Sequence, residues 1–344
     1  MQLSVLDLVP VRTDQSTAEA LAATVGLAQT ADRLGFTRYW VAEHHNMPAV
    51  GATSPPVLLA YLAAQTARVR LGSGGVMLPN HAPFAVAEQF ALLEAAAPGR
   101  IDLGIGRAPG SDPVTSLMLR GGNDAQEIAN FPDYLDQVRA MMSSRGVRVQ
   151  LRDSDYQLKA TPAAVSEPRL WLLGSSMYSA RLAAAKGLPY VFAHHFSGQG
   201  TEEALSYYRA HFTPSELCAE PTTFLTVNAV VAETRDEAVA LALPNLQLMA
   251  RLRTGRPLGP VALVEDAQAA SVSEAEQRVI EGGLARAVVG APAEAADQLR
   301  ALAERFGVNE VMLNPVASAH RATDPSTAPA RDRTCELLAT ELLS

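Results

Sequence analysis

The chain has 344 residues, of which 48% are hydrophobic and 19% are charged, and its formal net charge is −8 at pH 7. This composition is typical of a globular chain that buries a core, folded either as two average domains or as one large α/β barrel. No cluster of Lys or Arg stands out, so nucleic acid is not an expected partner, and the acidic balance mainly favours solubility.

The cysteine content and the N-terminal segment indicate a compartment. Cys218 and Cys335 are far apart and have no metal-ligand spacing, which argues against a disulfide framework and for a reducing environment. The first residues lack the features of a signal peptide, and no apolar run approaches the roughly 18 residues that span a bilayer. We therefore expect a cytoplasmic protein that has no membrane partner.

Strand-like and helix-like segments alternate along the chain. Strands are expected at 3–9, 38–45, 69–78, 100–106, 169–175, 189–195, 223–232 and 309–315. Helices are expected at 16–35, 55–66, 84–97, 131–144, 179–187, 202–212, 234–252, 291–307 and 332–343. Apolar strands that alternate with helices predict a parallel sheet covered by helices on its outside.

The number of strand–helix units selects among parallel folds. Eight units favour a (β/α)8 TIM barrel with insertions, which makes residues 1–344 a single domain. An open doubly wound sheet is the alternative, but no GxGxxG motif opens a helix in the first unit. Residues of about 245–290 hold extra helix and a Gly/Pro-rich bend, and they predict an insertion between strands seven and eight. We expect this insertion and the long loop at 107–130 to cover the active site.

Histidines are concentrated at two expected strand ends. Four of the seven form adjacent pairs, His44–His45 after Glu43 and His194–His195. A barrel carries its active site at the C-terminal ends of its strands, so both pairs fall at the expected site. Neighbouring residues of a strand point to opposite faces, so both members of a pair meet one ligand only if the strand has already turned.

Two further segments have features of a binding site. Gly72, Gly74 and Gly75 lie late in the third strand, where missing side chains permit either a simple bulge or the close approach of a planar ring. In the segment 169–187 a strand runs through a Gly-Ser-Ser turn into a helix, which directs free N–H groups and the helix dipole to one point.

That turn suits a phosphate group, although ordinary serine capping explains it equally well. Ser175, Ser176 and Ser179 supply hydroxyl groups at the turn, and Arg107 supplies a positive charge from the end of the neighbouring strand.

The segments "YWVAEHHN", "LGSGGVMLPNHAPFAVAEQF" and "LLGSSMYSARLAAAKGLPYVFAHHF" resemble the bacterial luciferase-like flavin monooxygenases. Within that superfamily the resemblance is to luciferase-family oxidoreductases of unassigned substrate. It extends over residues of about 2–212 and resumes at 288–314. The Glu-His-His of the second strand, combined with the Gly-Arg of the fourth, is its most specific part.

The resemblance implies a TIM barrel, usually dimeric, that binds FMN at the C-terminal face. Such enzymes use reduced FMN and O2, through a C4a-peroxyflavin, to insert one oxygen atom into a small organic substrate, and a separate flavin reductase can supply the reduced FMN. His44 matches the catalytic histidine, which acts as a general acid/base. The positions that match cofactor ligands are Gly74, Gly75, Arg107, Ser175, Ser176 and Ser179. Gly74 and Gly75 match a pair that forms a non-prolyl cis peptide bond beside the flavin ring.

Three alternatives stay open at the level of sequence. Relatives with this barrel use a deazaflavin for hydride transfer, and others bind flavin without catalysis. A barrel hydrolase would hold zinc with Glu43, His45 and His194 or His195, but the first strand lacks the His-x-His that such enzymes often carry. We therefore expect no metal. The sequence does not identify the substrate.

Overall fold

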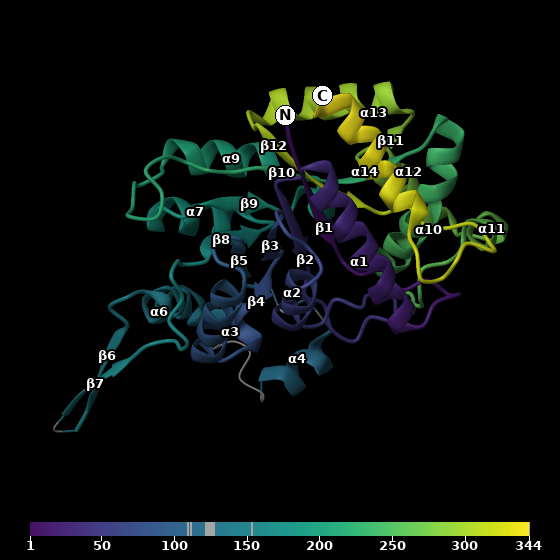
Figure 1. The fold of residues 1–344 in the computed structure, drawn as a ribbon. Coiled ribbons are helices and arrows are strands. Elements are labelled where there is room, and N and C mark those ends of the chain that lie inside the picture. Colours follow the sequence, from purple (N-terminus) through teal and green to yellow (C-terminus); the bar gives the residue numbers. More distant parts are fainter. Residues whose placement is uncertain (109, 111, 121–127, 153, 344) are drawn as a thin grey trace.

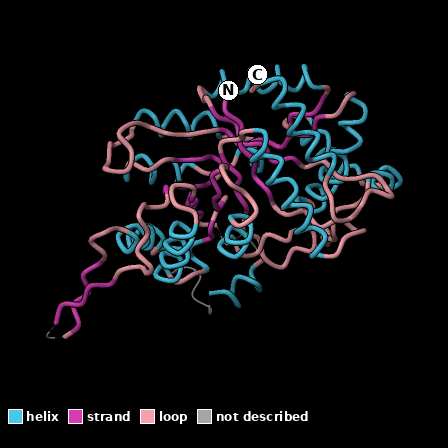
Figure 2. Tube along the Cα trace, viewed as in Figure 1, coloured by secondary structure: helices cyan, strands magenta, loops and turns pink. Residues whose placement is uncertain are grey.

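The computed structural model describes residues 1–108, 110, 112–120, 128–152 and 154–343. A β-sheet forms its centre and helices cover the outside of this sheet (Figures 1 and 2). The strands of the sheet are β1 (Gln2–Asp7), β2 (Arg38–Val41), β3 (Arg70–Ser73), β4 (Val76–Met77), β5 (Ile101–Gly106), β8 (Arg169–Gly174), β9 (Tyr190–Phe192), β10 (Leu225–Val231), β11 (Val288–Gly290) and β12 (Glu310–Pro315).

All strand pairs in this sheet are parallel, in the order β11-β10-β12-β1-β2-β3-β5-β8-β9, with β4 paired to β5. Buried apolar residues fill most of these strands, as expected for a sheet with both faces covered. All eight expected strands are present and parallel, although the third is divided into β3 and β4 at Gly74 and Gly75, and the short strand β11 was not expected.

The sheet curls until its first and last edges approach each other. In the described chain the two edges are joined by a single parallel bridge, between Tyr190 at the start of β9 and Thr223 before β10. The short strand β11 pairs with the later half of β10, from Ala229 onward, on the side away from β12. The chain therefore forms a curled parallel sheet, and the closed eight-stranded TIM barrel expected from the sequence is not confirmed. Strand β11 occupies part of the edge of β10 that closure of the barrel would use.

The helices and helical turns of the described chain are α1 (Thr17–Leu34), α2 (Pro55–Ala63), η1 (Leu78–Asn80), α3 (Pro83–Ala96), α4 (Pro113–Arg120), α6 (Phe131–Met142), α7 (Met177–Lys186), α8 (His194–Ser197), α9 (Thr201–Ala210), α10 (Arg235–Arg253), α11 (Val264–Ala269), α12 (Glu274–Leu284), α13 (Pro292–Phe306) and α14 (Pro329–Leu342). Local sequence sets several of their ends. Helix α1, for example, begins with a reciprocal capping box between Ser16 and Glu19 and ends at Gly35 in the left-handed conformation. None of the described helices has the length and apolar character needed to cross a bilayer.

Segments outside the regular repeat take several forms. The hairpin β6 (Val147–Leu151) and β7 (Ser154–Leu158) is antiparallel and projects from the body at the lower left of Figure 1. The expected insertion at 245–290 contains the second half of α10, helices α11 and α12, and β11. The loop expected at 107–130 contains α4, and its residues 109, 111 and 121–127 lie outside the described part of the chain.

A polar and aromatic cluster fills the interior of the sheet near the start of the strands. The guanidinium of Arg38 donates hydrogen bonds to the carboxylates of Asp102 and Glu310, at 2.7 and 2.6 Å, and it lies 4.9 Å from the ring centroid of Trp171. Trp40 and Trp171 meet edge to face at 5.7 Å. Because this end is closed by packed side chains, the opposite end is left for the site.

Candidate active site

Glu43 holds the end of β2 in place. Its carboxylate is fully buried and accepts hydrogen bonds from Nε2 of His45 at 2.9 Å, from Nε2 of His81 at 2.8 Å and from the backbone N–H of Met77 at 3.0 Å. Burial raises the pKa of Glu43, but the hydrogen bonds from His45 and His81 outweigh burial and lower the pKa to about 2. Glu43 is therefore an anion at neutral pH, and it joins β2 to β4 and to the residue that follows η1.

Only one of the two ring nitrogens of His44 has a hydrogen-bond partner among the described residues. Its Nδ1 lies 3.2 Å from the carbonyl oxygen of Gly110. A carbonyl only accepts, so Nδ1 carries the proton and Nε2 of the neutral ring keeps its lone pair. Burial lowers the pKa of His44 below 6.5. At pH 7 the residue is thus a neutral imidazole that can accept a proton at Nε2, for which the described residues provide no hydrogen-bond partner.

His195 faces the same region from the other side of the sheet. Its Nδ1 lies 2.9 Å from Oγ1 of Thr226, whose hydroxyl donates to the carbonyl of Phe192 at 3.2 Å. Nδ1 of His195 must therefore carry the proton, and Nε2 is again the free base. Burial, with smaller contributions from the charges of His44 and His194, lowers the pKa of His195 to about 4.

The two histidine pairs do not form a zinc site. His194 starts helix α8, so it does not continue the strand as expected; its Nδ1 contacts Oγ1 of Thr201 at 2.8 Å and its ring meets Phe306 at 5.2 Å. His194 and His195 therefore have different hydrogen-bond partners, Thr201 and Thr226. The carboxylate of Glu43 is already occupied by three donors. In the part of the chain that the structure describes, no three His, Cys, Asp or Glu side chains are grouped to hold a metal.

The peptide bond between Gly74 and Gly75 is cis, as the resemblance implies. Packing within the protein favours glycine at both positions, and most strictly at Gly75. A Cβ on Gly74 would lie 2.7 Å from Cδ1 of Leu6, and a Cβ on Gly75 would lie 2.5 Å from Cδ1 of Leu173 and 2.8 Å from the carbonyl oxygen of Gly104. The glycines are thus explained by strand packing, and their proposed contact with a flavin ring stays a prediction.

Hydrogen-bond donors that have no partner among the described residues gather where β5 and β8 end. Ser176 is the N-cap of α7, but its side chain makes no capping hydrogen bond. The guanidinium of Arg107 lies 3.9 Å from the ring centroid of Tyr178, in the first turn of the same helix. Among the described residues, no carboxylate pairs with Arg107. Uncommitted N–H groups, the positive end of a helix and a guanidinium together form a site suited to a phosphate.

The three serines of this turn are not equivalent. Ser175 and Ser176 are exposed at the start of α7, whereas Ser179 is buried. The hydroxyl of Ser179 donates to the carbonyl of Ser176 at 2.8 Å and lies 3.1 Å from the hydroxyl of Tyr190. Ser179 thus stabilises the turn from its buried side through the hydrogen bond to Ser176. Its expected direct contact with a phosphate stays a prediction.

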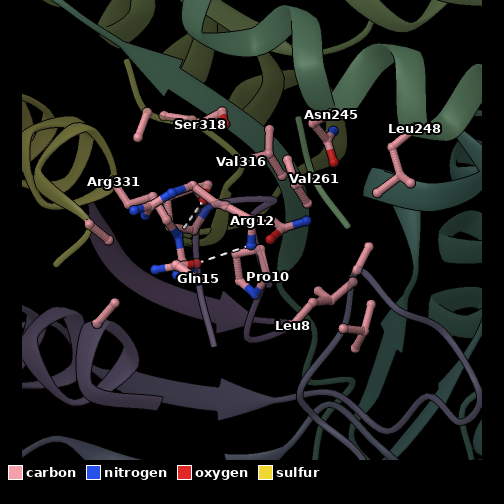
Figure 3. Close-up of a pocket in the computed structure, with 18 of the residues that line it drawn as sticks. Leu8, Pro10, Arg12, Gln15, Asn245, Leu248, Val261, Val316, Ser318 and Arg331 are labelled. Carbon is pink, nitrogen blue, oxygen red and sulfur yellow. Dashed lines mark hydrogen bonds between the residues drawn. The ribbon is translucent and has the colours of Figure 1, made fainter. Parts of the chain in front are cut away.

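Two cavities lie beside the later parts of β10 and β12, and His194 and His195 line the second of them. The first has an empty volume of about 720 Å³, part of which is open to solvent. Figure 3 shows Arg12, Gln15 and Arg331 on one side of it and Asn245 and Leu248 on the other. Its charges are neutralised, because Arg12 pairs with Asp14 at 2.9 Å and Arg331 pairs with Asp7.

The second cavity, of about 500 Å³ and also partly open, is lined by His194, His195, Asn228 and Asn245, among others. Asn245 belongs to both cavities. Asn314, in the wall of the first, donates to Asn228, in the wall of the second, at 2.8 Å. The two cavities are therefore neighbours, separated by asparagine side chains.

Sequence reasoning did not single out several residues of this region. His81 follows the third strand inside the segment "LPNHAP", and its proline-rich surroundings were the only signal. Asn228 interrupts the apolar run "LTVNAVV", which could have marked it as facing a polar site. Nothing in the sequence placed Thr226 beside His195, because that contact joins residues 31 positions apart.

Comparison with known protein sequences identifies the family. Residues 1–310 match the family described as luciferase-like monooxygenase. The luciferase-like monooxygenase of Escherichia coli K12 is 37% identical over 338 residues, 97% of each chain. The N-acetyl-S-alkylcysteine monooxygenase of Bacillus subtilis is 34% identical over 324 residues, 93% of this chain and 94% of the relative.

Solved structures share the fold over nearly the whole chain. Apo-MsnO8 is 32% identical, with a TM-score of 0.83, and the match covers 99% of this chain and 98% of that one. The oxygenating constituent of the Pseudomonas putida 3,6-diketocamphane monooxygenase, in complex with FMN, has a TM-score of 0.72 at 17% identity, over 99% and 97% of the two chains. An F420-dependent secondary alcohol dehydrogenase has a TM-score of 0.62 at 15% identity, over 98% of both chains. From these matches and its site, the chain belongs to the luciferase-like monooxygenase family.

Proposed function

We propose that this protein uses reduced FMN and O2 to transfer one oxygen atom to a small organic substrate. One observation carries the proposal: three features follow one another around the sheet at the later ends of neighbouring strands. They are the free Nε2 of His44, the Gly74–Gly75 pair, and the anion donors at Arg107 and Ser176. Family membership supports the reaction class, because two relatives are named as monooxygenases.

The residues present fit FMN. Arg107, Ser175, Ser176 and the N-terminal N–H groups of α7 would hold the phosphate, and the backbone at Gly74 and Gly75 would lie beside the ring. The chemistry that bound reduced FMN supplies is the pair of electrons that activates O2.

The protein supplies positioning and proton transfer. His44 would accept a proton at Nε2 from the reacting atoms and return it later, a task that its lowered pKa suits at neutral pH. Glu43 would act through its neighbours: by binding His45 and His81 it fixes the turn that aims His44. His195 would form the opposite wall, as a second neutral imidazole.

The deazaflavin alternative rests on the F420-dependent neighbour, which shares only the fold. Parallel fluorescence titrations with FMN, riboflavin and F420 test the proposal. We expect FMN to bind at least ten times more tightly than riboflavin, because only FMN carries the phosphate. Preferential binding of F420 would replace oxygen transfer by hydride transfer, and failure to bind any of the three would refute both.

The remaining parts of the proposal concern assembly. We propose that residues 1–344 act as one domain, in which the segment of about 245–290 covers the substrate side of the site. A separate reductase would supply reduced FMN, and the protein would form a homodimer in the cytoplasm. Light scattering on the purified protein tests the dimer, and FMN turnover with and without an added NADH-dependent flavin reductase tests the supply of electrons.

A further inference from the structure

The second cavity has an unbalanced positive charge. Its wall contains Arg253, from the last turn of α10, and Arg286, which follows α12. No Asp or Glu is among the described residues that line it. The histidines of the wall add no further charge at pH 7, since burial lowers the pKa of His194 and of His195.

Both arginine side chains are held beside helix α8. Nη2 of Arg253 donates to the carbonyl oxygen of Phe196 at 2.7 Å, and its guanidinium lies 6.0 Å from the Phe196 ring centroid. The side chain of Arg286 lies directly against Gly198, which has a φ of +63° and has no room for a Cβ because Arg286 occupies that space. The turn that carries His194 and His195 thus positions both cations.

The two cations lack the partners that nearby arginines have. Arg256 pairs with Glu276 at 2.9 Å and Arg278 pairs with Glu274 at 2.9 Å. Within the described chain, neither Arg253 nor Arg286 meets a carboxylate. Burial lowers the pKa of Arg286, and the charge of Arg253 lowers it further, so the two cations repel each other. An anion placed between them would relieve this repulsion and gain two charge-assisted hydrogen bonds.

We propose that the second cavity binds the carboxylate of an organic-acid substrate, with Arg253 and Arg286 as its anion ligands. This inference rests on the proposed function, because it names the substrate class of the same site. His195 also lines this cavity, so a bound carboxylate would share the cavity with one of the histidines of the candidate site.

The shape of the neighbouring cavity indicates the rest of the substrate. Asn245 lies in the walls of both cavities, and its amide makes no hydrogen bond to the described residues. Beyond it the first cavity presents apolar side chains, including Leu8, Val50 and Leu248, and its arginines are already paired. An acid bound at Arg253 and Arg286 would extend an uncharged, mainly apolar chain past Asn245 into this space.

Isothermal titration tests the proposal with straight-chain carboxylates of four to ten carbons and the matched alcohols as probes. We expect the protein with bound FMN to prefer a carboxylate over its alcohol by at least about tenfold. Arg253→Gln and Arg286→Gln should each weaken carboxylate binding about tenfold or more and leave alcohol binding unchanged. Arg251→Gln is the matched control, since Arg251 is exposed on α10 as Arg253 is, but does not line the cavity.

Several results would overturn the proposal. Equal binding of acid and alcohol, no binding of any probe, or an equal loss in Arg251→Gln would each show that the pair is not a specific anion site. A loss of FMN binding but not of riboflavin binding in Arg253→Gln would assign the cavity to the cofactor phosphate instead. Failure of the proposed function is separate: it appears as absent FMN binding in the unaltered protein, and the carboxylate preference is still measurable there without FMN.

Discussion

Replacement of the buried anion Glu43 by glutamine tests how the site is held together. The substitution keeps the shape of the side chain and removes its charge. The pKa of Glu43 is lowered from 4.5 to about 2 in the folded protein, chiefly by hydrogen bonds from His45 and His81 that outweigh burial. At about 1.4 kcal/mol for each pKa unit, this difference means that the anion contributes roughly 3 kcal/mol to the free energy of unfolding at pH 7.

The sign of the pH dependence follows from the lowered pKa. The stabilisation by Glu43 is complete above pH 4.5 and is lost as the pH falls toward 2. We therefore expect Glu43→Gln to lower the free energy of unfolding by up to about 3 kcal/mol at pH 7, and the difference from the unaltered protein to shrink to roughly half at pH 3.

Urea-induced unfolding, followed by tryptophan fluorescence, measures this difference, because Trp40 and Trp171 are both fully buried in the folded state. Glu202→Gln is the control, since Glu202 forms an exposed ion pair with Arg305 and should change little. If Glu43→Gln is no less stable than this control at pH 7, or if the difference does not depend on pH, then Glu43 is not the anion that fixes the turn.

Four other substitutions, used in three experiments, test the site and the strands that carry it. Arg107→Gln should weaken FMN binding by about 10- to 100-fold and leave riboflavin binding unchanged, as measured by fluorescence quenching; an equal loss for both ligands would remove Arg107 from the phosphate site. Gly75→Ala should destabilise the protein by about 1–3 kcal/mol, because its Cβ would lie 2.8 Å from the backbone carbonyl oxygen of Gly104. Gly26→Ala, with no atom within 4 Å of its Cβ, should instead stabilise α1 by about 0.5–1 kcal/mol. Thermal unfolding that ranks the two variants in the other order contradicts this packing. Because burial lowers the pKa of His44, product formation should be constant from pH 7 upward and fall only below pH 6.5, and this inflection should be absent from His44→Asn; a decline that begins above pH 7 would show that another group controls the rate.

The sequence was informative wherever a local pattern determines the structure. Continuous apolar runs predicted the parallel strands because such strands are buried on both faces. Helix α1 was predictable from its Ser/Thr start and its final glycine, which act within a few residues. The exposed hairpin of β6 and β7 was missed, although the alternating residues of "VRVQL" carry a weak strand signal.

Contacts between segments that are distant in the chain could not be predicted from the sequence. His81 joins Glu43 from 38 residues away, and only the fold shows that η1 delivers it there. His194 and His195 were expected at the end of a strand, but the chain turns into α8 at His194, and the two rings bind different threonines. The short strand β11, which pairs with the end of β10, was likewise not indicated by any local pattern.

The central claim is that His44 serves a reaction between reduced FMN and O2. Stopped-flow absorbance tests it directly, by mixing the anaerobic complex of the protein and reduced FMN with O2, for the unaltered protein and for His44→Ala. We expect a transient species whose spectrum differs from those of reduced and oxidised FMN, with a changed lifetime in the variant. Reoxidation at the rate of free FMN in both proteins would contradict the claim.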